Sequence, residues 1–92
     1  MREKGFNRET SEQLAIEALS WLAGDPGALS RFLSLAGIGP TTLRTAAADP
    51  AFLAGILDFL LSDEELRLSF ADNAGVKPER IGEARRALDG YS

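Results

Sequence analysis

The segment LSLAGIGPTTLR, Leu33 to Arg44, has the residue types and spacing of a phosphate-binding helix-hairpin-helix loop. In such loops, glycines let the backbone approach a phosphate, and N–H groups at the start of the following helix point towards it. A glycine, an apolar residue and a second glycine occur here in the required order. The pattern predicts nucleic-acid contact through the phosphate backbone at Gly37, Ile38, Gly39, Thr41, Thr42 and Arg44.

Three features favour a plain helix connector over this phosphate site. The motif usually places Lys or Arg directly after the loop, whereas this chain has Thr41 and Thr42 there. The stretch 25–75 carries seven acidic and three basic residues, and a negative field repels phosphates. A second corner, AGVKP, has the same form with Lys77 in place of the second glycine. A glycine cap followed by a proline at the first helical position explains both corners, so nucleic-acid binding is the alternative interpretation.

Other chemistry has little support in the sequence. The chain has no cysteine and no histidine, which removes thiolate chemistry and the commonest general base and metal ligand. It has no Walker loop, zinc spacing, nucleophile elbow or paired-carboxylate signature. The run Asp63-Glu64-Glu65 is typical of a solvated helix start, where the helix dipole favours anions. We therefore expect no enzyme activity, no cofactor and no metal.

Three further groups of residues admit a functional interpretation and a structural one. Asp58 lies in an otherwise apolar segment, and we expect it on the one solvated stripe of that helix or capping a neighbouring backbone. Arginines near the C-terminus alternate with acids, which predicts a salt-bridged solvent face. Aromatic residues are expected in the core rather than in a ligand site. The predicted salt-bridged face contains Arg80, Arg85 and Arg86. The aromatic residues expected in the core are Trp21, Phe59, Phe6 and Tyr91.

Helix start and stop signals recur along the whole chain, and strand signals are weak. Thr10 with Gln13, and Ser62 with Glu65, have the spacing of capping boxes. Asp25-Pro26 and Asp49-Pro50 each combine an N-cap with a proline in the first turn. The segment 51–61 is apolar nearly all round and is expected to be the central, buried helix. The signals predict helices over 10–23, 26–36, 40–47, 51–61, 63–74 and 78–89.

These elements predict a single all-α domain, a compact bundle of five to six short helices over residues 10–90, preceded by a flexible polar arm over residues 1–9. A domain of this size has a thin stability margin and needs an efficient core. The expected core residues are Leu19, Leu22, Phe32, Leu33, Phe52, Ile56, Leu57, Leu60, Phe70, Ile81 and Leu88.

The sequence contains a weak internal repeat, which becomes visible when the chain is aligned with itself at a shift of thirty-eight residues. The shift places eight residues on identical ones, and the two Gly-x-x-Pro corners coincide. Repetition of this kind predicts two similar three-helix units packed against each other. Two units are too few for an open solenoid, which favours a compact bundle. The matched residues are Leu19, Leu22, Asp25, Phe32, Ala36, Gly37, Pro40 and Ala46 in the first unit.

The order of these motifs resembles a bacterial family of short proteins, domain-of-unknown-function family 3572. The shared signals are the Asp-Pro starts, the two Gly-x-x-Pro corners, the Ala-rich short helix and FLAGILDFLLSDEELRLSFA, and they extend over residues 15–88. The resemblance implies an all-helical fold in a bacterial, cytoplasmic setting and transfers no activity to any residue. We expect a non-enzymatic interaction or adaptor module with a protein partner, no membrane association, and a monomer or weak homodimer.

Overall fold

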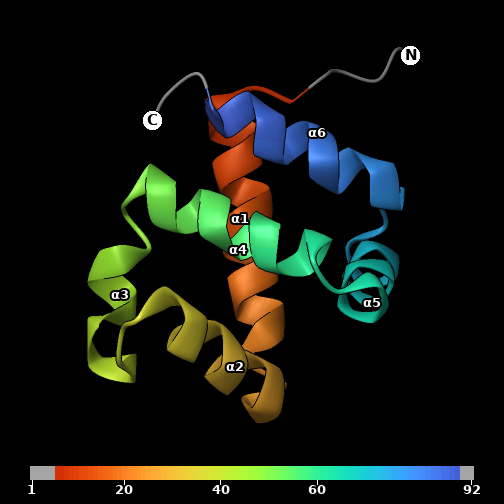
Figure 1. Ribbon diagram of the computed structural model, residues 1–92. Coiled ribbons are helices and arrows are strands. Elements are labelled where there is room, and N and C mark those ends of the chain that lie inside the picture. Colours follow the sequence, from red (N-terminus) through yellow and green to blue (C-terminus); the bar gives the residue numbers. More distant parts are fainter. Residues whose placement is uncertain (1–5, 90–92) are drawn as a thin grey trace.

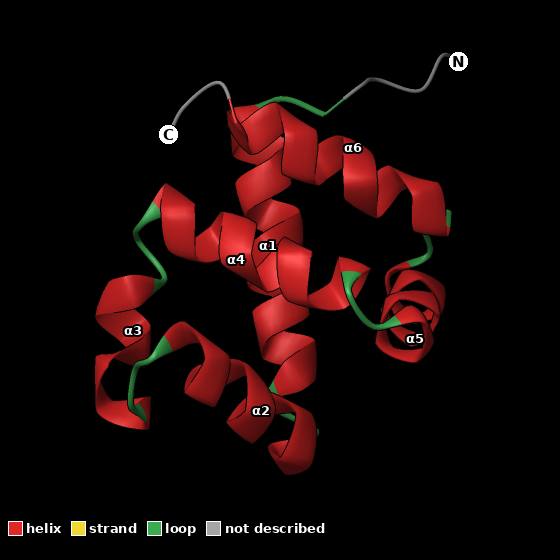
Figure 2. Ribbon diagram, in the orientation of Figure 1, coloured by secondary structure: helices red, strands yellow, loops and turns green. Residues whose placement is uncertain are grey.

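The computed structural model describes residues 6–89, and this part of the chain folds into six α-helices and one 3₁₀ turn with no strand. Figures 1 and 2 show these helices joined by short loops. The predicted all-α bundle is confirmed. Residues 1–5 of the expected N-terminal arm lie outside the described residues. The elements are α1 (Arg8–Leu22), α2 (Pro26–Ala36), η1 (Pro40–Thr42), α3 (Leu43–Ala46), α4 (Pro50–Leu61), α5 (Glu64–Ala74) and α6 (Pro78–Asp89).

The centre of the molecule is α4, which crosses α1 near the middle of Figure 1. It packs against α1, α2, α5 and α6, and α6 also packs against α1 and α5. This position explains why α4 is apolar nearly all round, because a helix covered on several sides needs apolar residues on several faces. The predicted central helix is therefore confirmed. Its buried residues are Leu53, Ala54, Ile56, Leu57, Phe59 and Leu60.

Most of the large residues predicted to form the core are buried. Several small residues outside the predicted set are buried as well. Nine of the eleven expected residues are buried, while Leu19 and Phe52 are partly buried against the core. The small side chains lie on several helices, and they let the helix backbones approach closely. One of them, Ser11 on α1, has a buried hydroxyl oxygen with no hydrogen-bond partner. The small buried residues are Ser11, Ala15, Ala18, Ala28, Ala54, Ala71 and Ala84.

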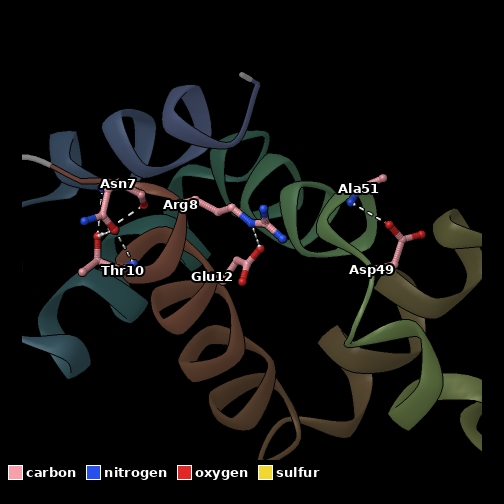
Figure 3. Close-up of polar contacts among 6 residues, drawn as sticks. All are labelled: Asn7, Arg8, Thr10, Glu12, Asp49 and Ala51. Carbon is pink, nitrogen blue, oxygen red and sulfur yellow. Dashed lines mark hydrogen bonds and ion pairs between the residues drawn. The ribbon is translucent and has the colours of Figure 1, made fainter. Parts of the chain in front are cut away.

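The start of α1 differs from the prediction. The capping box is formed by Asn7 and Thr10: Asn7 Oδ1 accepts a hydrogen bond from the Thr10 N–H at 2.9 Å, and the Asn7 N–H donates to Thr10 Oγ1 at 2.9 Å (Figure 3). The helix therefore begins at Arg8, and the proposed Thr10–Gln13 box is wrong. Asparagine caps at least as well as threonine, so the earlier start adds a turn at no cost in capping. An Arg8–Glu12 ion pair at 3.2 Å supports that added turn (Figure 3).

The start of α5 also differs from the prediction, because Asp63 is the N-cap and not Ser62. The Asp63 carboxylate accepts a hydrogen bond from the Leu66 N–H at 3.1 Å. The Ser62 hydroxyl instead donates to the Phe59 carbonyl at the end of α4, at 2.8 Å. A charged cap gains from the helix dipole, which favours aspartate at this position. The proposed Ser62–Glu65 box is wrong.

The two aspartate–proline starts have the predicted form. Asp25 accepts a hydrogen bond from the Ala28 N–H at the start of α2, at 3.2 Å. Asp49 accepts one from the Ala51 N–H at the start of α4, at 3.0 Å (Figure 3). Each proline sits in the first turn, where its missing N–H has no intrahelical partner to lose.

The repeat of thirty-eight residues is visible in the local structure. The bounds of α2 and α5 differ by thirty-eight at both ends. Each of these helices ends at a left-handed glycine, Gly37 with φ 72° and ψ 27° and Gly75 with φ 71° and ψ 29°. The third helices break the repeat, because α3 has four residues and α6 has twelve.

Aromatic contacts join the two units crosswise. Trp21, at the end of α1, packs on Phe70 of α5 with ring centroids 5.5 Å apart. The repeat-equivalent pair, Phe59 at the end of α4 and Phe32 of α2, has centroids 5.4 Å apart. Each unit therefore places the aromatic residue from the end of its first helix against the second helix of the other unit. The two units share one core.

Candidate functional site

The corner between α2 and η1 uses most of its backbone N–H groups internally. The Gly37 and Ile38 N–H groups donate to the Leu33 carbonyl at 2.9 and 3.2 Å, which is the bonding of a glycine C-cap. The Thr42 N–H and hydroxyl both donate to the Gly39 carbonyl, at 3.2 and 2.9 Å. A phosphate would need such donors to point outward and to be free.

The cations beside this corner add little to a phosphate site. Arg31 lies 3.3 Å from the Asp63 carboxylate and stacks over the Phe59 ring at 5.6 Å from its centroid. Arg44 is exposed in the last turn of α3. The Leu66 N–H, followed by the Arg31 guanidinium, lowers the pKa of Asp63, so this acid keeps its charge beside Arg31. Nucleic-acid binding at Gly37–Thr42 stays a prediction.

A groove lies between α2, α3 and α4. Its volume is about 630 Å³. The three elements that enclose it follow one another around one side of Figure 1, in yellow and green. Twelve residues line the groove, and most of them are apolar or lack a side chain. It is the candidate functional site.

The α2 wall of the groove ends in an exposed leucine, and aromatic rings lie behind it. Leu35 is 76% exposed, the highest value among the large apolar residues that the structure describes as exposed. Phe32 lies between Phe52 and Phe59 of α4, with centroids 5.4 Å from each. These ring contacts form part of the apolar lining, and Leu35 offers apolar surface to solvent at the rim.

The α4 side of the groove contains Gly55 in the middle of the helix. A glycine costs a helix interior about 1 kcal/mol relative to alanine. Gly55 does not have a positive φ, and a Cβ built on it would meet nothing within 4 Å. The fold therefore does not require glycine at this position. Its effect is to leave the groove open between Phe52 and Phe59.

The charged residues that line the groove are both acids. Asp49 lies at the start of α4 and Asp58 lies in the third turn, and both are exposed. Asp58 accepts a hydrogen bond from Arg85 of α6 at 2.7 Å, and Arg85 also pairs with Asp89. These contacts raise the pKa of Arg85, which stays charged. The Asp58 side chain stays 56% exposed beside Arg85.

Three residues of the groove have polar, exposed counterparts in the other unit. Adding thirty-eight to the number of Leu35 gives Asn73 of α5, and subtracting thirty-eight from that of Gly55 gives Glu17 of α1. Asn73 and Glu17 are both exposed. Asp58 maps to the exposed Ser20 in the same way. Of the two corresponding surfaces, only the one between α2 and α4 therefore combines an exposed leucine with a glycine. The sequence contained this signal in the aligned repeat.

Most of the remaining candidate residues have structural partners, but among the described residues Arg86, the third arginine of the predicted face, forms no ion pair. Arg80 pairs with Glu83 and Arg85 with Asp89, as predicted for a salt-bridged face, and Arg80 also lies over the Phe6 ring at 4.6 Å. Trp21 and Phe59 each pack on another aromatic ring, and Tyr91 lies outside the described residues. Within residues 6–89, no three acidic side chains gather as they would around a metal ion. No helix of this part is both long enough and apolar enough to cross a membrane.

Comparison with known protein families gives a match over nearly the whole chain. The family model described as "Protein of unknown function (DUF3572)" matches residues 8–91, which include every helix of the fold. No curated protein and no solved structure matches the chain. The matched region contains both corners and the groove between α2 and α4. The chain therefore belongs to the DUF3572 family of proteins of unknown function.

Proposed function

We propose that this protein is a non-enzymatic interaction module that binds an apolar segment of a partner protein in the groove between α2 and α4. The observation that carries the proposal is the groove itself, about 630 Å³ in volume with Leu35 exposed at its rim. Apolar grooves of this kind are a common place for a partner's helix to bind. The counterparts of Leu35 and Gly55 in the other unit, Asn73 and Glu17, are polar and exposed, which supports the groove as a feature of one unit and not of the repeat.

The shape of the groove favours a protein segment over a small molecule. Small-molecule sites bury most of the ligand surface, whereas a wall residue here stands 76% in solvent. The charges also favour binding over catalysis. Asp49 and Asp58 are separated by nine positions, roughly 13 Å along a helix, and paired-carboxylate hydrolysis needs separations below about 10 Å.

Site-specific photocrosslinking tests this proposal. A photoreactive phenylalanine analogue replaces Leu35 in the full chain, and a second version carries it at the equivalent residue Asn73. Both are irradiated in cells of the native organism, and each is repeated with Gly55→Leu, which fills the groove, and with Glu17→Leu, the equivalent change on α1. Because a Cβ at position 55 meets no atom, we expect Gly55→Leu to fold, and a far-UV circular dichroism melt checks this.

The expected result is a discrete adduct from position 35 that survives Glu17→Leu and disappears with Gly55→Leu. Position 73 should give no such adduct. An adduct that is indifferent to Gly55→Leu, or equal labelling at positions 35 and 73, would overturn the proposal. So would the absence of any adduct from position 35.

We place the proposed module in a bacterial cytoplasm, the setting that the family resemblance implies, and the absence of cysteine fits a reducing compartment. We propose that it is a monomer or weak homodimer. Sedimentation of the purified chain across a concentration series tests the oligomeric part.

A further inference from the structure

We infer that the segment bound in the groove is an amphipathic helix that carries a basic residue at each end of its apolar stripe. The inference rests on the proposed function and specifies the chemistry of its partner. Its evidence is the charge, the spacing and the hydrogen-bonding capacity of the groove residues.

The polar groups of the groove favour a helix over an extended chain. The polar side chains in its lining belong to Asp49, Asp58 and Ser62, and the Ser62 hydroxyl already donates to the Phe59 carbonyl. An extended peptide would face this apolar lining with unpaired N–H and C=O groups, which is costly. A helix pairs its backbone groups internally and presents only side chains, as in other helix-in-groove complexes.

The charge of the groove favours a basic partner. Its charged lining residues are both acids, and the Asp58 side chain stays 56% exposed beside Arg85. The stretch 25–75, which supplies all the lining residues, has a net charge of −4. Complementary charge directs association and excludes like-charged competitors. An acidic surface of this kind also disfavours a second copy of this chain as the occupant.

The spacing of the two acids sets the spacing of the partner's cations. Asp49 and Asp58 bracket the helical segment that contains Gly55. A bound helix that runs along α4 would match them with two basic residues eight or nine positions apart, because each residue advances a helix by about 1.5 Å. Large apolar residues between those cations would enter the space above Gly55. The partner pattern is therefore basic, apolar at i, i+3, i+4 and i+7, then basic.

Three synthetic helices of about fourteen residues test the inference. The first carries a leucine stripe between two lysines nine positions apart. The second keeps the stripe and has glutamates in place of the lysines, and the third keeps the lysines and has serines in place of the leucines. Each is titrated into the ¹⁵N-labelled full chain at low and at raised salt, and the amide shifts give both affinity and location.

We expect the lysine–leucine helix to shift the amides of Leu35, Gly55 and Phe59, and to bind about tenfold more tightly than the glutamate helix at low salt. That preference should shrink as salt screens the exposed charges. The serine helix should not bind. Asp49→Asn, which keeps the N-cap acceptor, and Asp58→Asn should each reduce the preference about two- to fivefold. Asp72→Asn, at an exposed acid of α5 outside the groove lining, is the matched control and should leave the preference unchanged.

The other outcomes separate this inference from the proposed function. Equal binding of the lysine and glutamate helices at the groove would overturn the basic pattern and leave the groove as a binding site. Binding of none of the helices would overturn the inference, while the crosslink from position 35 still decides the proposed function. Groove amides that shift with protein concentration alone, and stop doing so in Gly55→Leu, would identify a second copy as the occupant and overturn the inference.

Discussion

The two halves of this molecule have closely similar helix ends and corners and different surfaces. In both halves a helix of eleven residues ends at a left-handed glycine, and an aromatic residue from each half packs on the other half. The third helix is long and well buried in the second half, through Ile81, Ala84 and Leu88. In the first half the third helix has four residues and none of them is buried.

The second half uses its third helix to build the core, whereas the first half leaves a groove beside its short third helix. Where the long α6 packs on α1, α4 and α5, the adjoining surface can be polar, as Asn73 and Glu17 are. Where α3 ends after one turn, a groove remains, and the chain lines it with apolar residues. The corners themselves are alike in both halves, so their geometry alone does not define a functional site.

The largest effect is expected at the crossed aromatic pairs. Phe70→Ala removes a fully buried ring and should cost about 3–5 kcal/mol in the free energy of unfolding, and Phe32→Ala should cost somewhat less because Phe32 borders the groove. Urea denaturation followed by circular dichroism measures the loss for Phe32→Ala, and the helical signal in buffer without urea reports the loss for Phe70→Ala. A chain of this length has little stability in reserve, so Phe70→Ala should be largely unfolded. A large loss for one variant and none for the other would show that the two joints between the halves are not equivalent.

The next effect concerns the corner glycines. Gly37→Ala and Gly75→Ala each force alanine into the left-handed region, and each should lower the free energy of unfolding by about 1–2 kcal/mol. Gly39→Ala is the control, because Gly39 has no positive φ and open space around it. It should change stability little.

Titration of the labelled protein with short DNA tests the nucleic-acid alternative at the same corner. Amide shifts that are concentrated at Gly37–Thr42 and fade with salt would support that alternative.

A smaller effect of opposite sign is expected at the groove. Gly55→Ala should raise the free energy of unfolding by up to about 1 kcal/mol, because alanine favours the helix and its Cβ meets no atom. Thermal denaturation measures the gain. A loss of stability would mean that the fold itself requires glycine in α4, and this would remove one argument for a binding groove.

The smallest effect is expected at acid pH. The pKa of Asp63 is lowered from its ordinary value of 3.8, so its stabilising contribution is complete well above that pH and is lost as the pH falls through the folded pKa. Asp63→Asn keeps a capping oxygen and removes the ion pair with Arg31. We expect unfolding midpoints for this variant that fall less between pH 5 and pH 2 than those of the parent chain. Parallel curves for the two proteins would contradict the assignment.

The sequence predicted the architecture well because helix punctuation and apolar spacing are local. Proline starts, glycine ends and the apolar central helix all appear in the structure. Two helix starts were placed on the wrong residue, since several neighbouring side chains can cap and only the energies of the whole turn decide among them. The burial of Ser11 was missed because it depends on how closely α1 approaches its neighbours, which no local pattern reports.

The groove was the part that local reasoning did not find. The loop motif points to Gly37 and Gly39. Gly55, the glycine that lies in the groove, has no special backbone requirement. Gly55 becomes notable only when α2, α3 and α4 are placed together and when the polar equivalent position, Glu17, is seen beside it. An unoccupied space results from three segments at once, so it has no signature in any one of them.

Gly55 has a consequence for how variants of this protein are selected in the laboratory. A screen that ranks substitutions by abundance or heat resistance should favour alanine at position 55, because the helix gains and the added Cβ meets no atom. A screen that ranks them by growth under conditions where the partner is needed should reject the same substitution. Among the positions of α4, this one should show the sharpest disagreement between the two rankings, and mapping such disagreements along the chain would outline the working surface even while the partner is unidentified.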